Sequence, residues 1–338
     1  MISINALIGK LTEGKNLSTE EAQSAMEGMI SGTFTPAQSA ALHVALKMKV
    51  ETNEEITAFA KIMRKHAVAI HPKAKNTDDM GLVDTCGTGG DASFTFNIST
   101  AAALIAASAG VKIAKHGNRS ISGKSGSADV IEALGIKILQ PQQVEKCINE
   151  CGFGFMFAPY FHPAMKNIMP VRKELGIRTV FNVLGPLTNP AGAQAQLLGV
   201  FNVALAPKLA EVLQMLGTKH ALVVHSEGMD EIGLGKTNVC ELKDGSISTY
   251  VIDASEFGMK KRTVPTAQSK EESAAIVLEV LAGKPGAALD VSLLNAAAAI
   301  YVSGKAETIK QGLEIAREAV KSGAANKKLE QLRAFTGE

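Results

Sequence analysis

Two glycine-rich segments of this sequence are well suited to bind a phosphate group. The first is Gly87–Asp91, with glycine at three of its five positions, and the second is Lys115–Asp129, which combines cationic, hydroxyl and amide side chains with further glycines. Glycine lets backbone N–H groups approach a ligand closely, and clustered N–H groups bind anions. A plain tight turn for the first segment and a solvated basic loop for the second are the alternative interpretations.

Neither segment fits a familiar nucleotide-binding motif. Gly87-x-Gly89-x-x-Ala92 has the spacing of the dinucleotide fingerprint, but residues 93–97 delay the next helix, and the next predicted strand ends in Lys115 instead of an acid. Gly123-Lys124-Ser125 matches the end of a P-loop, but that motif needs glycine at the position of Asn118. The sequence therefore argues against nicotinamide binding and against a standard nucleotide triphosphatase.

Two shorter segments could complete an anion and metal site. Asn97-Ile98-Ser99-Thr100 precedes a run of small residues, so it predicts a capped helix whose free N–H groups face an anion; a simple cap is the alternative. Asp230-Glu231 follows a predicted strand, and paired carboxylates suit Mg²⁺ that also binds substrate phosphates. An ordinary charged loop is the alternative for the acid pair.

Arg172 stands in a further polar segment, 162–192, and could bind a carboxylate through two parallel hydrogen bonds. An ordinary charge on a surface helix is the alternative. From the residues alone, both interpretations stay open.

The elements that must position these residues fall into two groups. The first seventy positions predict successive helices, because three capping boxes each open an apolar run at helical spacing: Ser18 with Glu21, Thr35 with Gln38, and Thr52 with Glu55. The polar stretch 71–80 then reads as a linker. Beyond it, strand and helix patterns alternate, which is typical of an α/β sheet covered by helices.

The expected strands of this second part are 81–86, 111–114, 136–139, 153–158, 195–201 and 221–225, with a β-hairpin at 238–252 that turns at 243–245. The expected helices are 99–109, 128–134, 142–149 and 207–216, and three helices, 273–282, 291–303 and 306–322, finish the chain.

Composition sets limits on the function. The 338 residues carry a formal net charge of only +2, and tryptophan is absent, so we expect neither nucleic-acid nor membrane binding. The four cysteines fit no zinc pattern, and a reduced state is the simplest interpretation. We find no signal peptide and no apolar run long enough for a bilayer, and therefore expect a cytoplasmic protein.

Taken in order, the motifs resemble those of the anthranilate phosphoribosyltransferase family of tryptophan biosynthesis, over nearly the whole chain. The matching segments are 87–91, 97–100, 115–128, 162–166, 172–179, 182–190 and 230–231.

The resemblance implies an α/β fold of the nucleoside phosphorylase and phosphoribosyltransferase type, with a central mixed, mostly parallel sheet. A small all-helical domain, residues 1–72, would be completed by a helical segment near 163–190 and would make a homodimer contact. Residues 73–80 would form a hinge, and residues 81–338 the domain that binds phosphoribosyl pyrophosphate (PRPP).

The resemblance also implies roles for individual residues. Arg172, Asn118 and Gly87 would contact anthranilate, while Ser99, Asp230 and Glu231 would hold Mg²⁺, with two ions in each active site. His116 would orient a substrate without acting as an essential base. The implied PRPP contacts are Gly87, Gly90, Asp91, Thr95, Asn97, Ile98, Ser99, Thr100, Lys115, His116, Gly117, Asn118, Arg119, Ser120, Ile121, Ser122, Gly123 and Ser127.

The implied reaction transfers the phosphoribosyl group of PRPP to the amino group of anthranilate and releases pyrophosphate. A pyrimidine nucleoside phosphorylase shares the two-domain architecture, but it needs no acid pair such as Asp230-Glu231. A non-catalytic, nucleic-acid-binding relative of this fold needs a strongly basic groove, which a net charge of +2 argues against.

Overall fold

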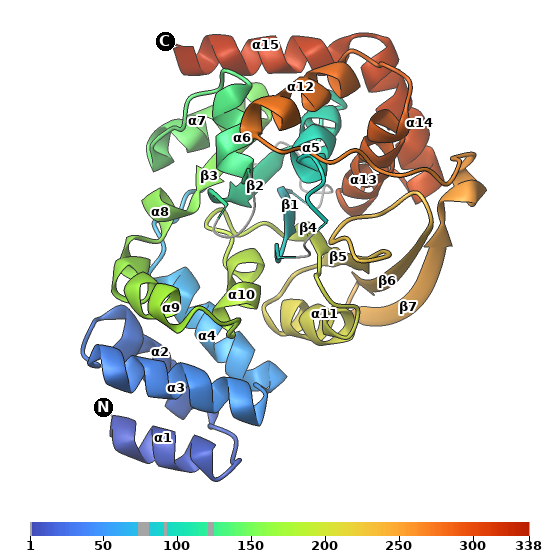
Figure 1. The fold of residues 1–338 in the computed structure, drawn as a ribbon. Coiled ribbons are helices and arrows are strands. Elements are labelled where there is room, and N and C mark those ends of the chain that lie inside the picture. The colour runs from blue at the N-terminus through green and yellow to red at the C-terminus, as the bar shows by residue number, and fades with distance from the viewer. Residues whose placement is uncertain (1, 74–80, 91–92, 121–124, 338) are drawn as a thin grey trace. The chain divides into compact units, whose positions relative to one another are not determined.

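A computed structural model describes residues 2–73, 81–90, 93–120 and 125–337 (Figure 1). Their contacts define two compact units, which we treat separately: a helical unit, residues 1–69 with 159–190, and a sheet unit, residues 70–158 with 191–338. Residues 74–80 of the predicted hinge lie outside the described residues, so the hinge and the predicted domain limits stay predictions.

The helical unit begins with four helices, α1 (Ile4–Thr12), α2 (Thr19–Ile30), α3 (Pro36–Lys49) and α4 (Asn53–Lys65). Each of the three predicted capping boxes is present: the side chains of Ser18, Thr35 and Thr52 accept from the N3 backbone, and the N3 side chain accepts from the cap in return. These bonds satisfy N–H groups that a helix start leaves open, which explains where α2, α3 and α4 begin.

Residues 159–190 add short helices to this unit. They are α8 (Ala158–Phe161), α9 (Met169–Leu175) and α10 (Phe181–Leu184), with the 3₁₀ helices η1 (Pro163–Asn167) and η2 (Gly185–Leu187). Asn167 Nδ2 donates to the carbonyl of Ile30 at 2.6 Å, and Arg64 Nε donates to the carbonyl of Leu187 at 2.8 Å. Two stretches of chain about 90 residues apart in sequence are thereby joined.

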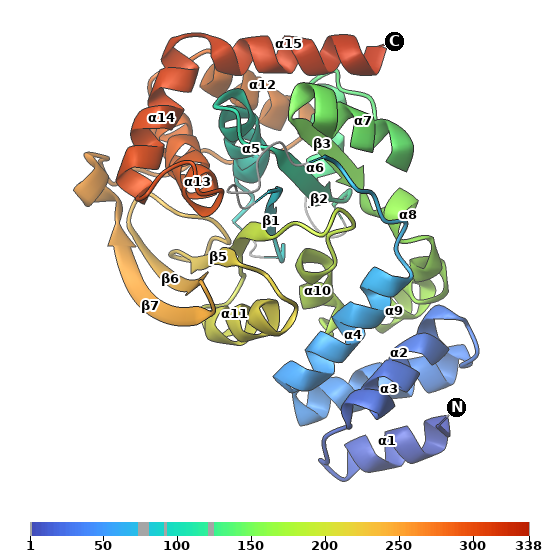
Figure 2. The same cartoon turned by 180° about the vertical axis from the view of Figure 1, so that it is seen from behind.

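The sheet unit contains seven strands in the order β3-β2-β1-β4-β5-β6-β7 (Figure 2). The five strands from β3 to β5 are parallel, and β6 and β7 continue the sheet antiparallel, so the predicted mixed, mostly parallel sheet is confirmed. The strands are β1 (Val83–Gly87), β2 (Ile113–Gly117), β3 (Phe153–Phe157), β4 (Ala195–Gly199), β5 (His220–His225), β6 (Lys236–Lys243) and β7 (Ser246–Asp253).

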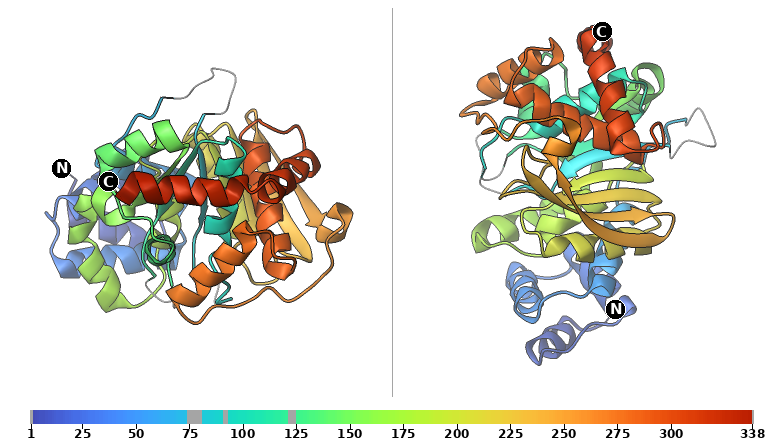
Figure 3. Two further views of the ribbon diagram at one scale, coloured as in Figure 1. Left: turned by 90° about the horizontal axis from the view of Figure 1, so that it is seen from above. Right: turned by 90° about the vertical axis from the view of Figure 1, so that its right-hand side faces the viewer.

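Helices cover both faces of this sheet, as the right-hand view of Figure 3 shows for α11 and the C-terminal helices. Right-handed crossovers explain the arrangement, because the chain winds from β1 toward β2 but from β4 toward β5. The helices are α5 (Ile98–Ser108), α6 (Ser127–Ala133), α7 (Pro141–Cys151), α11 (Leu205–Met215), α12 (Lys270–Leu281), α13 (Ala287–Val302), α14 (Ile309–Lys321) and α15 (Ala324–Gly337), with the 3₁₀ helix η3 (Ala254–Phe257).

The predicted hairpin is present as β6 and β7. Asp244 and Gly245 connect the two strands, and both have positive φ, 49° and 76°. This is the backbone that a two-residue turn between twisted antiparallel strands requires, and Asp-Gly adopts it readily.

Two expectations about elements are wrong. Residues 136–139 form no strand, and the Lys137 N–H donates to Thr336 Oγ1 of α15 instead of to a sheet neighbour. Three helices do not finish the chain, since α15 follows α14. Its buried Ala325, Leu329 and Leu332 lie at helical spacing, so the pattern for a fourth helix was present in the sequence.

Two absences concern only the part of the chain that the structure describes. All four cysteines are free thiols there. In the same residues, no helix has both the length and the apolar character needed to cross a bilayer.

Candidate functional site

The candidate site of the sheet unit lies where β1 and β4 end side by side. The chain winds away from these two strands in opposite directions, and open α/β sheets bind ligands at the carboxyl ends of such a pair. Gly87 ends β1 and is the register partner of Gly199, which ends β4. The first glycine-rich segment therefore begins at the expected ligand-binding edge.

Asp230 packs closely against both Gly87 and Gly199. A Cβ added to Gly87 would lie 2.3 Å from Asp230 Oδ2, and one added to Gly199 would lie 1.6 Å from the Asp230 carbonyl oxygen. The N–H of Gly89 donates to Asp230 Oδ2 at 2.9 Å. The glycine loop and the acid pair, far apart in sequence, thus form one structure, and glycine is required where a side chain would displace the acid.

Helix α5 starts beside this loop, as predicted from Asn97–Thr100. Asn97 caps the helix by accepting from the Thr100 N–H at 3.2 Å, and its own N–H donates to Ser273 Oγ at 2.9 Å. The side chains of Ile98 and Thr100 are fully buried, so only their backbones can face a ligand. The positive end of the helix dipole favours an anion at this helix start.

Lys115 places a buried charge next to that helix start. Its side chain is only 1% exposed, and Nζ donates to Ser99 Oγ at 3.0 Å and to the carbonyl of Thr85. Burial lowers the pKa of Lys115, while the negative charges of Asp84, Glu231 and Asp230 act in the opposite direction. The ammonium group and the acid pair therefore lie within one another's electrostatic field.

The rest of the second glycine-rich segment folds on itself. The carbonyl of Asn118 accepts from the Ala128 N–H at 3.2 Å and from Ser127 Oγ at 3.4 Å. A Cβ on Gly117 would lie 2.2 Å from Ser127 Oγ, so the chain passes very close to itself. His116 is buried, and its N–H donates to Asp84 Oδ1 at 3.1 Å. The loop returns its backbone to the same sheet edge.

Two predicted PRPP contacts, Arg119 and Thr95, interact with other residues of the sheet unit. Arg119 bonds to Glu132 through both terminal nitrogens, at 2.7 and 2.8 Å, and to Asp129 at 2.7 Å. Thr95 forms an isolated antiparallel bridge with Thr266. The structure thus engages both residues with other parts of the sheet unit. Four predicted PRPP contacts lie outside the described residues, namely Asp91, Ile121, Ser122 and Gly123.

Arg172 belongs to the helical unit, on α9. Its guanidinium lies 5.4 Å from the ring centroid of Phe181, and Nη1 lies 3.6 Å from the sulfur of Met169. Burial lowers its pKa, and within the described residues it forms no ion pair with a carboxylate. A half-buried guanidinium with this environment is suited to receive a carboxylate from outside the chain.

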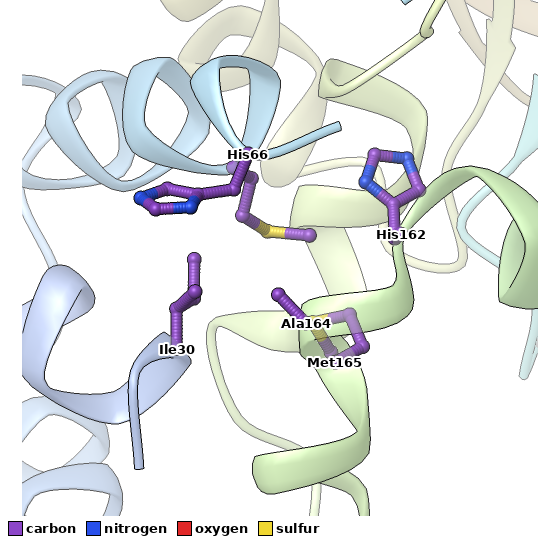
Figure 4. Close-up of a pocket in the computed structure, with 6 residues that line it drawn as sticks. Ile30, His66, His162, Ala164 and Met165 are labelled. Carbon is purple, nitrogen blue, oxygen red and sulfur yellow. The ribbon is translucent and has the colours of Figure 1, made fainter. Parts of the chain in front are cut away.

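A small pocket also occurs in the helical unit, between α2, the end of α4 and η1 (Figure 4). His66, His162, Ile30, Ala164 and Met165 are among the residues that line it. Its volume of about 10 Å³ fits no more than one water, although a surface hollow of about 330 Å³ adjoins it. His66 is engaged with Glu27 at 2.6 Å. No predicted site residue lines this pocket.

Known proteins resemble this chain along its whole length. The a/b domain of the glycosyl transferase family matches residues 79–326, and its helical bundle domain matches residues 5–67. Anthranilate phosphoribosyltransferase of Nitrosomonas eutropha is 49% identical over 338 residues, which cover 98% of each chain. The chain belongs to the anthranilate phosphoribosyltransferase family.

Solved structures of this family share the fold. Anthranilate phosphoribosyltransferase of Thermus thermophilus superposes with a TM-score of 0.92 at 42% identity, covering 98% of this chain and 99% of its own. The enzyme of Saccharomyces cerevisiae, in complex with PRPP and Mg, gives 0.89 at 29% identity and covers 99% and 98%. Another structure of the yeast enzyme, with a TM-score of 0.87 at 29% identity, contains 4-fluoroanthranilate.

For this member of the anthranilate phosphoribosyltransferase family, the sequence reasoning overlooked several residues near the site. Asp84 is fully buried and holds the His116 backbone, and it stands only three positions before Gly87. An acid inside a predicted strand was therefore a signal that the sequence offered. Gly199 and Asn295 carry no local signal, because their contacts with Asp230 and Ile232 arise only from folding.

Proposed function

We propose that this protein transfers the phosphoribosyl group of PRPP to the amino group of anthranilate, giving N-(5-phosphoribosyl)anthranilate and pyrophosphate in tryptophan biosynthesis. The main support is the convergence of a glycine loop, a buried lysine and an acid pair at one sheet edge: Gly87–Gly90, Lys115 and Asp230-Glu231. That combination offers close backbone approach and positive charge to phosphate groups, and carboxylates to a metal.

The PRPP site would combine backbone and side-chain groups of the sheet unit. The start of α5 and the backbone of Gly87–Gly90 would face phosphate oxygens, and Lys115 would add a positive charge whose position is fixed by its bonds to Ser99 and Thr85. We propose the predicted residues as the PRPP contacts, except that the buried side chains of Ile98 and Thr100 would not touch the ligand. Ile98 and Thr100 would act through the backbone of the helix start, because their N–H groups donate to the Phe96 carbonyl and to Asn97 Oδ1.

The acid pair suits magnesium. Asp230, Glu231 and the Ser99 hydroxyl offer only oxygen atoms, the ligands that Mg²⁺ prefers, and Mg²⁺ commonly uses one or two carboxylates together with substrate phosphates. The Gly89 N–H holds Oδ2 of Asp230 and so orients its carboxylate. When bound, Mg²⁺ would neutralise negative charge on the diphosphate of PRPP. We propose two ions in each active site.

The chain itself would act mainly by positioning and electrostatics. The bond from the anomeric carbon to pyrophosphate breaks with its electron pair on the leaving oxygen. The amine nitrogen bonds to that carbon and loses one proton, which water or the released pyrophosphate accepts. The aromatic amine is neutral at pH 7, so the reaction needs no strong base. Holding both reactants in line can supply roughly 7–11 kcal/mol. His116 would orient a substrate from its buried place.

Arg172 would bind the carboxylate of anthranilate. The Phe181 ring lies beside the guanidinium at 5.4 Å, and no carboxylate of the described residues neutralises it. The yeast relative binds 4-fluoroanthranilate, which carries the same carboxylate. We keep Gly87 and Asn118 as proposed additional contacts to this substrate.

A fluorescence assay tests the proposed reaction. Purified protein, Mg²⁺, PRPP and anthranilate should give the fluorescence change of anthranilate conversion, and removal of Mg²⁺ by a chelator should stop it. Replacement of both Asp230 and Glu231 by Ala should abolish the turnover. A protein that instead cleaves pyrimidine nucleosides with phosphate, and leaves anthranilate unchanged, would show that the phosphorylase alternative is right.

A further inference from the structure

The loop that carries Asp230 and Glu231 is bound by a residue of α13. Asn295 is fully buried, and its Oδ1 accepts from the Ile232 N–H at 3.0 Å. Its Nδ2 donates to the Ile232 carbonyl at 2.8 Å and to the Val291 carbonyl at 2.9 Å. One side chain thus bonds both backbone groups of the residue that directly follows the acid pair.

These three bonds fix the orientation of the Asn295 amide. Both hydrogens of Nδ2 have acceptors, and Oδ1 has a donor, so turning the amide over would place oxygen against two carbonyls. The Ile232 side chain is 1% exposed, so its backbone groups lie where an unmade bond costs free energy. The interaction is therefore specific for an amide side chain of this length.

Besides the bonds that Gly89 donates to Asp230 and Lys261 donates to Glu227, the loop has short-range bonds of its own. Ser226 and Met229 exchange backbone bonds at 2.7 and 3.1 Å, and Ser226 Oγ donates to the Glu231 carbonyl at 2.6 Å. They shape the turn but do not tie it to another helix. Asn295, 63 positions beyond Ile232, connects the turn to α13, a helix buried along most of its length.

We infer that Asn295 is a positioning residue for the acid pair: it anchors the Ile232 backbone to α13, and so holds Asp230 and Glu231 at the sheet edge for Mg²⁺ and PRPP. The three bonds of the Asn295 side chain all go to backbone groups of the protein. The inference rests on the proposed metal role of the two acids, and it adds a residue that the motifs of the sequence do not contain.

The main test uses Asn295→Asp, which keeps the side-chain size and an acceptor for Ile232 but loses both N–H donors. We expect its apparent dissociation constant for Mn²⁺, measured by electron paramagnetic resonance with PRPP present, to rise at least about tenfold. The Mg²⁺ concentration for half-maximal activity should rise similarly, whereas the KM for anthranilate should change less than about twofold. Hydrogen exchange should quicken at the amides of Ile232 and Gly233.

Ser292→Ala is the matched control. Ser292 lies one turn before Asn295 on α13, is fully buried, and its hydroxyl has no hydrogen-bond partner in the described residues. Its loss should leave Mn²⁺ binding unchanged. Asn295→Ala is the second variant if the aspartate variant does not fold, because the space it opens lets a water bridge the Ile232 groups.

Wild-type Mn²⁺ affinity in a folded Asn295 variant that merely has a lower melting temperature would overturn the inference, since a structural role alone would then be sufficient. Failure of the proposed metal site is distinguishable. In that case Asp230→Asn and Glu231→Gln would also bind Mn²⁺ as the wild type does, whatever the Asn295 variants show.

Discussion

Close approach, more than charge, sets the position of Asp230. Two glycines leave space for it, and a third, Gly89, donates a hydrogen bond to its carboxylate. Motif reasoning could find Gly87 and Asp230 because each stands in a recognisable segment. It could not find Gly199 or Asn295, since nothing in their local sequence shows which residue they will meet after folding.

Gly199→Ala tests this steric argument. The new Cβ would overlap a backbone oxygen, which cannot swing away as the end of a flexible side chain can. We expect the loop to shift, the free energy of unfolding to fall by about 1–3 kcal/mol, and the affinity for PRPP to drop. Urea unfolding and calorimetric PRPP titration measure both effects.

Gly9→Ala is the control for that experiment. Gly9 lies within α1, and no atom lies within 4 Å of the Cβ it would gain. Alanine should stabilise this helix by about 0.5–1 kcal/mol and leave PRPP binding unchanged. Equal losses in the two variants would contradict the close-approach explanation.

Arg172→Ala addresses the substrate carboxylate. Loss of a hydrogen-bonded charge pair is worth about 1.5–3 kcal/mol, so we expect the KM for anthranilate to rise more than tenfold. The KM for PRPP should change far less, because the proposed PRPP contacts lie in the sheet unit. Steady-state kinetics with each substrate varied in turn measure the two KM values. An equal rise in the KM for anthranilate and the KM for PRPP would rule out the carboxylate role.

At the scale of elements, prediction succeeded where a local signal sets the boundary. Capping boxes start three helices, and Asp244-Gly245 turns the hairpin. It failed for 136–139, whose apolar pattern suits burial in either a strand or a loop. Only contacts made after folding, such as the bond from Lys137 to Thr336 of α15, decide between them.

Buried histidine makes the helical unit sensitive to acid. His43 of α3 is fully buried, and its ring centroid lies 4.9 Å from that of Phe181. Neither nitrogen of the His43 ring has a hydrogen-bond partner in the described residues. Burial, assisted by the charge of Arg172, lowers its pKa to about 4. The unfolded chain takes up a proton near pH 6.5, and the folded chain does so only near pH 4.

It follows that His43 removes stability as the pH falls from about 6.5 to about 4, by up to roughly 3 kcal/mol. We expect His43→Leu to flatten the decline of the unfolding free energy between pH 7 and pH 5, measured by urea unfolding. Replacement of the exposed His71 by Gln should keep the wild-type decline. An unchanged slope in His43→Leu would show that other groups cause the acid sensitivity.

At the scale of the whole molecule, we propose a homodimer formed through the helical domain. Met48 on α3 is 78% exposed, Val50 just beyond the helix is 62% exposed, and Val44, one turn before Met48, is also exposed. Apolar side chains gathered on one helix surface are typical of an interface between proteins.

Sedimentation equilibrium measures this assembly. The wild type should have twice the mass of one 35.4 kDa chain, and Met48→Glu should shift it toward the monomer, because a charge in an apolar interface is costly. Met215→Glu, at an exposed methionine of the sheet unit, should remain dimeric. A monomeric wild type would exclude the proposed assembly.

The helical unit is built from two separate stretches of chain, and this sets an order of events during protein synthesis. The ribosome makes residues 1–69 early, but their partners at 159–190 come only after the first three strands of the sheet. Ile30 and Arg64 must therefore wait for Asn167 and Leu187 while the nascent chain grows. In the same way α5 cannot be enclosed before α13 and α15 are made, so the sheet unit reaches its final packing only when its C-terminal helices have been synthesised.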